Sequence, residues 1–152
     1  MILLNDILKG RLFGHPIHMM LVHFPAALFP ISAALSFVSY FLNDKILSLF
    51  NFYIICIGTA IGWVALIFGV NDLVKINELK LPFKVALIHG GLDILWLSVF
   101  STIAGVQFKY YPQIPTPSLI EVLIEIVVVS AMIYSNYLGG ELVLKYGVGK
   151  KI

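Results

Sequence analysis

PIHMMLVHFPAALFPISAALSFVSYF, residues 16–41, is an apolar segment without a single Asp, Glu, Lys or Arg. It is longer than the roughly 20 residues that a helix needs to cross about 30 Å of hydrocarbon. It is also longer than the apolar region of a signal peptide, and no small-residue cleavage site follows it. We therefore predict that residues 16–41 form a transmembrane helix that is retained in the protein.

Three more apolar segments follow, at residues 51–70, 83–108 and 118–139. Of the 152 residues, 60% are hydrophobic and 12% are charged, whereas about 25% of the residues of a soluble domain are charged. Too few polar groups remain to cover a surface that faces water. The sequence predicts an all-α, four-span transmembrane helical bundle that forms one integral membrane domain over residues 1–152 and contacts the lipid bilayer.

The basic residues predict the orientation of the bundle. Four spans place both termini and the loop between the second and third spans on the same face. Eight Lys and Arg residues belong to that face, and only Lys45 and Lys109 belong to the other. Cytoplasmic loops carry the excess of basic residues, so we expect both termini to be cytoplasmic in a bacterial inner membrane. The net charge of +2 reflects this topology, and nothing in the sequence indicates nucleic-acid binding.

Prolines, glycines and one polar motif predict details of the helices. Pro25 and Pro30 lie inside the first span, where each removes a backbone hydrogen bond and favours a kink. Residues 118–121, SLIE, have the pattern of a capping box that begins the fourth span. We expect the pair Gly139 and Gly140 to end this span before a short amphipathic tail.

Histidines gather at the cytoplasmic ends of two spans. His15 and His18 lie at the mouth of the first span, and His23 lies about 10 Å deep at 1.5 Å per residue. His89 of the third span lies at nearly the same depth. Ionisable residues inside a membrane are costly and usually functional. Two histidines at matched depth on different helices could therefore bind one metal ion between them.

Helical geometry separates these residues by direction. At 100° per residue, His18 and His23 point about 140° apart, so a regular helix cannot offer both to one ion. His89 and Asp93 share a face at i, i+4, so Asp93 could orient the imidazole. Gly90 leaves room for a bulky group. The polar residues Asn71 and Asp72 end the second span at the same face.

Three interpretations compete for the histidines. The first is one b-type haem held between spans one and three, as in other helix bundles. Its iron ligands would be His23 and His89, with His18 replacing His23 if Pro25 distorts the helix. The second is a zinc or copper site made by three or four of the histidines, including His15. The third has no cofactor, and the histidines hold a kinked helix to its neighbours. The haem propionates would face the basic residues Lys84, Arg11 or Lys75.

The haem interpretation predicts membrane electron transfer, with a quinone or other subunits of a redox complex as partners and a homo-oligomer as one possible assembly. The alternative function is a non-enzymatic accessory subunit or a zinc- or copper-binding membrane protein without haem. We expect an electron carrier or redox-complex subunit more than a stand-alone catalyst, and the sequence offers no catalytic residues. Cys56 is the single cysteine, so a covalently attached c-type haem is excluded. Glu125, deep in the fourth span, could accept a proton.

Two motifs resemble a known family. HPIHMMLVHFPAAL (residues 15–28) and GGELVLKYGVGK (residues 139–150) are similar to a bacterial family of predicted four-helix membrane proteins, domain of unknown function 2231. The resemblance covers about residues 14–150. It implies the fold and the membrane location and leaves the function open. Met19 replaces a proline that is frequent in the family, and Tyr146 replaces a frequent histidine. The matching motif positions are His15, Pro16, His18, His23, Pro25, His89, Gly139, Gly140, Gly147 and Gly149.

Overall fold

The computed structural model describes residues 2–76 and 80–148 and confirms the all-α four-span bundle. Its elements are α1 (Ile2–Leu8), β1 (Arg11–Leu12), β2 (His15–Pro16), α2 (Ile17–Leu21), α3 (His23–Leu42), α4 (Lys45–Leu73), α5 (Leu81–Phe108) and α6 (Leu119–Leu144). The strands β1 and β2 form a small antiparallel hairpin that the sequence analysis did not predict. Its turn contains Phe13 and Gly14, both with positive φ.

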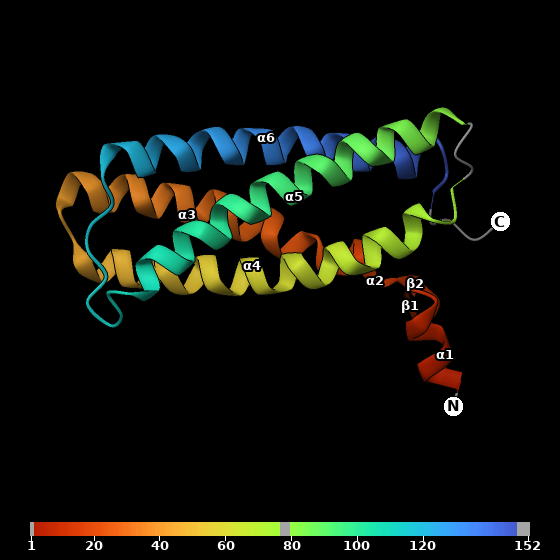
Figure 1. Cartoon of the computed structure of the whole chain (residues 1–152), viewed down its shortest axis with the longest axis horizontal. Coiled ribbons are helices and arrows are strands. Elements are labelled where there is room, and N and C mark those ends of the chain that lie inside the picture. Colours follow the sequence, from red (N-terminus) through yellow and green to blue (C-terminus); the bar gives the residue numbers. More distant parts are fainter. Residues whose placement is uncertain (1, 77–79, 149–152) are drawn as a thin grey trace.

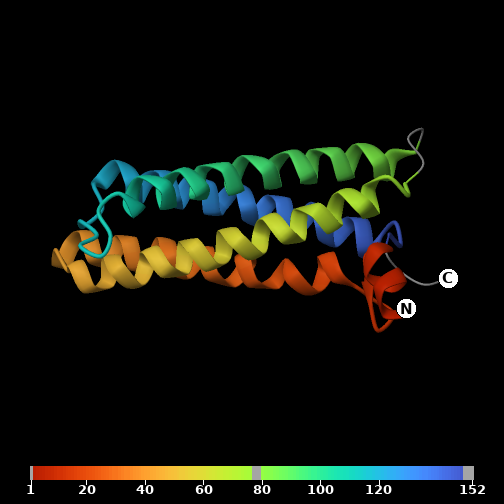
Figure 2. The ribbon, with the colours of Figure 1, turned by 60° about the horizontal axis from the view of Figure 1, so that its bottom comes forward.

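The four long helices run up and down in chain order (Figures 1 and 2). Each packs on the next, and α3 also packs on α6, so the bundle is closed. We call the end that carries α1, the last turn of α4 and the last turn of α6 the terminal end. The other end carries the α3–α4 and α5–α6 connections, and we call it the loop end.

Local capping interactions fix several helix boundaries. The side chain of Asp44 accepts hydrogen bonds from the backbone N–H groups of Ile46 and Leu47, so α4 begins at Lys45 and not near residue 51. Ser118 and Glu121 form the predicted capping box at the start of α6. Such reciprocal bonds satisfy N–H groups that the first helical turn leaves free.

The prediction that Gly139 and Gly140 end the fourth span is wrong, because α6 continues through both glycines to Leu144. A glycine in a helix costs only about 1 kcal/mol relative to alanine, and packing overrides that cost. A glycine is present at 139 because the ring of His89 packs closely against this position.

The first span contains a local break at Val22, between α2 and α3. Pro25 has no N–H group, so the carbonyl of Leu21 loses its i+4 partner at this point. The backbone stays nearly helical, because Val22 donates to His18 O and Ala26 donates to Val22 O. The predicted effect of Pro25 is therefore a small break, and Pro30 lies inside α3 without another one.

The outer faces of the helices are apolar. In each of the four spans, no more than 33% of the most apolar 18-residue window is buried inside the bundle. The remaining side chains are half-buried or exposed, and the exposed ones include many Leu, Ile, Val and Phe residues. Such a surface suits lipid and not water.

Aromatic side chains fill the middle of the bundle. Phe29 and Phe100 stack with ring centroids 3.9 Å apart, and Trp96 packs edge-on against Phe29 at 5.4 Å. We call this cluster the apolar layer; its buried members are Phe29, Ala33, Ile55, Trp96, Leu97, Phe100, Val129 and Met132. Along α6, Val129 and Met132 lie between the buried polar residues Glu125 and Ser135. The layer thus separates polar groups near the terminal end from polar groups near the loop end.

Candidate cofactor site

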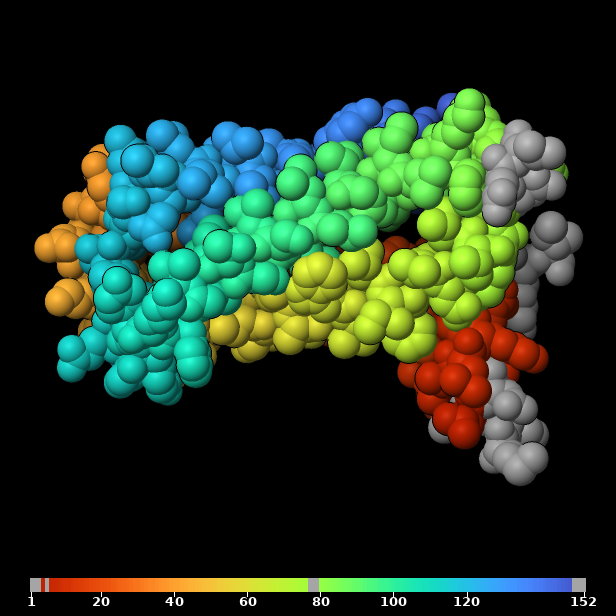
Figure 3. Space-filling model, in the orientation of Figure 1, coloured from red at the N-terminus to blue at the C-terminus, as the bar shows by residue number. Residues whose placement is uncertain are grey.

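A cavity of about 660 Å³ lies between the helices in the terminal half of the bundle. The surface is hollowed between α4 and α5 in this half (Figure 3). Most of its lining is apolar, and the polar exceptions converge from several helices: His18, His23, Asp72, His89, Asp93 and Asn136. Volumes of about 300–1,000 Å³ with a few convergent polar groups are typical of sites for small molecules and cofactors.

His18 reaches into the cavity from α2. Its Nδ1 lies 2.8 Å from the carbonyl oxygen of Ala65 on α4. A carbonyl oxygen only accepts, so we assign the proton to Nδ1. The Nε2 of a neutral His18 then carries a free lone pair. A backbone carbonyl that orients an imidazole in this way is the usual support of a metal-binding histidine.

His89 reaches the same cavity from α5 and is buried. Its Nδ1 lies 2.8 Å from Ser135 Oγ, and Ser135 Oγ in turn donates to Asp93 Oδ1. Asp93 Oδ2 lies 3.4 Å from His89 Nε2, so the predicted i, i+4 contact is present. Trp96 Nε1 also donates to Asp93 Oδ1. Asp93 and Ser135 therefore engage both ring nitrogens, so His89 must give up its contact with Asp93 Oδ2 to bind a metal ion through Nε2.

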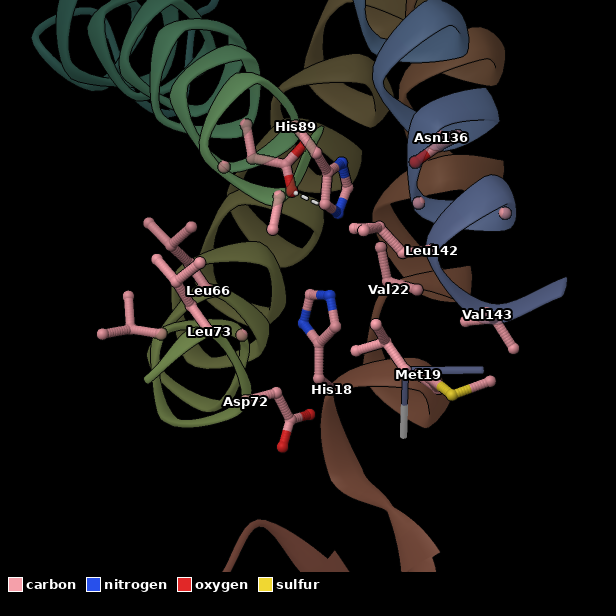
Figure 4. A pocket seen from close by; sticks show the side chains of 18 of the residues that line it. His18, Met19, Val22, Leu66, Asp72, Leu73, His89, Asn136, Leu142 and Val143 are labelled. Carbon is pink, nitrogen blue, oxygen red and sulfur yellow. Dashed lines mark ion pairs between the residues drawn. The ribbon is translucent and has the colours of Figure 1, made fainter. Parts of the chain in front are cut away.

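The rings of His18 and His89 face each other across the cavity (Figure 4). Their centroids are 6.1 Å apart, and their planes are inclined by 66°. Two imidazole nitrogens that bind one metal ion from opposite sides, each at about 2.0 Å, hold the two ring centroids about 6 Å apart. The observed spacing thus fits one ion between the two rings.

Glycines shape the cavity around both histidines. A Cβ atom on Gly69 would lie 3.1 Å from the His18 ring, and one on Gly139 would lie 3.1 Å from the His89 ring. Each ring therefore packs closely against a glycine, and a larger residue there would push the ring aside by a few tenths of an ångström. Gly90 and Gly91 also line the cavity, and Cβ atoms there would meet no atom within 4 Å. The space predicted beside Gly90 is present.

The other two histidines lie differently. His23 is exposed at the start of α3 and lines the edge of the cavity. His15 is exposed on β2, and it shares a shallow surface depression with His23, Pro16 and the methionines 19 and 20. Among the described residues, no three His, Cys, Asp or Glu side chains form a group that could hold a metal ion. The structure brings His18 and His89 together and leaves His15 and His23 at the surface.

The remaining predicted residues are divided between the cavity and the N-terminal segment. Asp72 lines the cavity and pairs with Lys75 at 3.0 Å. Asn71 instead donates to Leu8 O at 3.2 Å, and Lys75 donates to Lys9 O at 3.0 Å. These bonds attach the N-terminal segment to the end of α4. Of the residues that the structure describes, no Lys or Arg lines the cavity itself.

Sequence reasoning missed Ser135, Gly139 and the carbonyl of Ala65. Ser135 and Gly139 are four residues apart on α6, so both meet His89 from one face of that helix. A serine followed by a glycine at this spacing inside an apolar helix was the available signal. The role of Ala65 had no signal, because a backbone carbonyl is common to all residues.

One comparison with known proteins agrees with a membrane protein. The family model described as "Predicted membrane protein (DUF2231)" matches residues 14–151. No curated protein and no solved structure matches the chain.

Proposed function

We propose that this chain, which belongs to the DUF2231 family of predicted membrane proteins, binds one b-type haem in the terminal-half cavity and transfers electrons in the membrane. The observation that supports this most directly is the opposed pair His18 and His89, whose ring centroids are 6.1 Å apart. Each ring comes from a different helix and has its Nδ1 engaged by a fixed partner. When bound, the haem iron supplies a one-electron redox couple.

The geometry favours His18 over His23 as the partner of His89. His18 points inward against α4, whereas His23 is exposed beyond the break at Val22. The roles of the chain's own residues follow from this choice. Ala65 O holds the tautomer of His18, Ser135 and Asp93 orient His89, and the apolar lining excludes water.

The test is a set of four alanine variants of the full chain, purified from haem-replete cells. His18→Ala and His89→Ala should lose the Soret band of low-spin haem, because alanine cannot ligate iron. His15→Ala is the matched control and should keep the spectrum of the unchanged protein. His23→Ala should also keep it. A colourless wild-type protein would contradict the assignment. So would a Soret band that is lost in His23→Ala and kept in His18→Ala.

A second function of a different class is a zinc- or copper-binding membrane protein, or an accessory subunit without haem. The same two imidazoles favour it, since they could bind a single small ion together with an external ligand. Metal analysis of the four variants separates the two functions. Zinc or copper bound stoichiometrically without a Soret band, and lost in the His18 and His89 variants, would assign the cavity to the metal.

The proposed location is the bacterial cytoplasmic membrane, with the terminal end in the cytoplasm. The basic residues of that end support this orientation. Lys75, which lies beside the lining residue Asp72, could then pair with the haem propionates. A quinone or another subunit of a redox complex would exchange the electron, and assembly as a homo-oligomer is compatible with the exposed apolar faces.

A further inference from the structure

A second buried polar cluster lies on the other side of the apolar layer. Its centre is Glu125 of α6, whose side chain has no exposed surface. Ser32 Oγ donates to Glu125 Oε2 at 3.0 Å, and Ser36 Oγ donates to Oε1 at 2.6 Å. Both serines belong to α3 and are also fully buried. Both oxygens of the carboxyl group are therefore held by hydroxyl groups of a different helix.

Asn51 of α4 completes the cluster. Its Nδ2 donates to Ser36 Oγ at 2.7 Å, and it is 2% exposed. Its Oδ1 has no hydrogen-bond partner among the described residues. An unsatisfied buried polar atom costs about 1–3 kcal/mol. A group that donates a hydrogen bond to Asn51 Oδ1 would remove that cost.

Buried hydroxyl groups continue from the cluster to the loop end. Ser39 lies three residues beyond Ser36 on the same face of α3, and its Oγ is 2.7 Å from Ser48 Oγ of α4. Ser39 Oγ also donates to the carbonyl of Asp44, in the short connection between the two helices. Buried polar groups thus extend from Glu125 to the loop end, and among the described residues no direct hydrogen bond joins Ser36 to Ser39. Toward the terminal end it faces the apolar layer.

The surroundings of Glu125 offer no cationic partner among the described residues. On α6, the nearest acid is Glu121, which is engaged in the capping box. The other titratable groups of this half are exposed or half-buried: Tyr40 on α3, Asp44 in the α3–α4 connection, Lys45, Tyr53 and Cys56 on α4, and Lys109, Tyr110 and Tyr111 at and just after the end of α5. A carboxylate without a counter-ion is costly in a membrane interior, so residues of this kind mark ion or proton pathways.

We propose that Glu125 is a proton-binding site that exchanges with water at the loop end through Ser36, Ser39 and Ser48. The proton comes from water at the Asn43–Asp44 connection. Each hydroxyl group accepts one proton and passes on another, a water molecule bridges the step from Ser39 to Ser36, and the last proton bonds to a carboxyl oxygen of Glu125. Release reverses these steps, and no bond between heavy atoms changes. The proposal needs no haem.

The first test measures proton occupancy in the full chain, reconstituted in nanodiscs of neutral lipid. Dicyclohexylcarbodiimide adds to protonated carboxyl groups in apolar surroundings, and mass spectrometry locates the adduct. Glu125 should be labelled, and the labelling should fall as the pH rises through a single titration. Glu121→Gln is the matched control and should keep the adduct, whereas Glu125→Gln should lose it. An adduct that is absent at every pH, or lies elsewhere, would overturn the proposal.

The second test measures the route. After a rapid pH jump, infrared spectroscopy follows the carbonyl band of the protonated Glu125 carboxyl group. Replacing Ser39 and Ser48 together by alanine should slow this signal by roughly tenfold or more. Ser130→Ala removes an exposed serine of α6 and is the control. Equal rates in the two variants would refute the route. If Na⁺ but not K⁺ suppresses the labelling at constant pH, the bound ion is sodium and the proposal of a proton-binding site is overturned.

Discussion

Replacing Gly139 with alanine should weaken the proposed haem binding through its contact with His89. The added Cβ would lie 3.1 Å from Cε1 of the imidazole, whereas ordinary contacts begin at 3.4 Å. The ring must therefore move by about 0.3 Å, the difference between these two distances. It cannot move freely, because Ser135 and Asp93 hold it. Disturbing the residues that orient a metal ligand costs about 10- to 100-fold in affinity, or about 1.4–2.7 kcal/mol.

The assay is a titration of the haem-free protein with haem, followed by the Soret band. Gly105→Ala is the control, because it adds the same methyl group to a helix at a position that meets no atom within 4 Å and lies outside the cavity. Both variants gain up to about 1 kcal/mol of helix propensity. A difference in haem affinity between them therefore reports the contact of the added Cβ at position 139 with His89. Equal haem affinities in the two variants would refute the reasoning.

Four further results are expected. Ser135→Ala should lower haem affinity about 10- to 100-fold, measured by the same titration, while Ser130→Ala leaves it unchanged. Gly62→Ala should destabilise the bundle by about 1–3 kcal/mol in denaturant unfolding, because its Cβ would lie 2.5 Å from buried Leu97; unchanged stability would show that Leu97 simply turns aside. A cytoplasm-specific reporter at the C-terminus should be active, and activity of a periplasmic reporter there would reverse the orientation. Glu125→Gln should reduce the pH dependence of the haem midpoint potential if proton and electron movements are coupled, and an unaltered dependence would separate them.

The four spans could be predicted because their signal is the composition of each segment. Runs such as residues 16–41 are apolar on every side, and no tertiary contact is needed to recognise them. The capping box of Ser118 and Glu121 was predictable for the same reason, since its bonds are local. The start of α4 was not predictable, because Asp44 caps it through a geometry that many loop residues share. The end of α6 was not predictable either, because packing decides whether a glycine ends a helix.

The candidate site was predictable in its residue types and depth more than in its pairings. Matched depth identified His89 and the first span, and the i, i+4 spacing identified Asp93. The choice between His18 and His23 depends on how the helix turns around Pro25, which a regular-helix calculation leaves out. Ser135 comes from a helix that the histidine pattern does not include. Contacts between helices are the part of the site that one-dimensional spacing cannot encode.

The stacked rings of Phe29 and Phe100 have an electrical consequence. Hydrogen-bonded groups on either side of them can reorient in a field, whereas the packed rings cannot. With the four spans across a membrane, these rings would therefore carry the largest share of the membrane potential. The full potential does about 2.3 kcal/mol of work per elementary charge for each 100 mV. Charge that crosses between His89 and Glu125 would be driven by voltage, and charge that moves within one half of the bundle would barely respond to it.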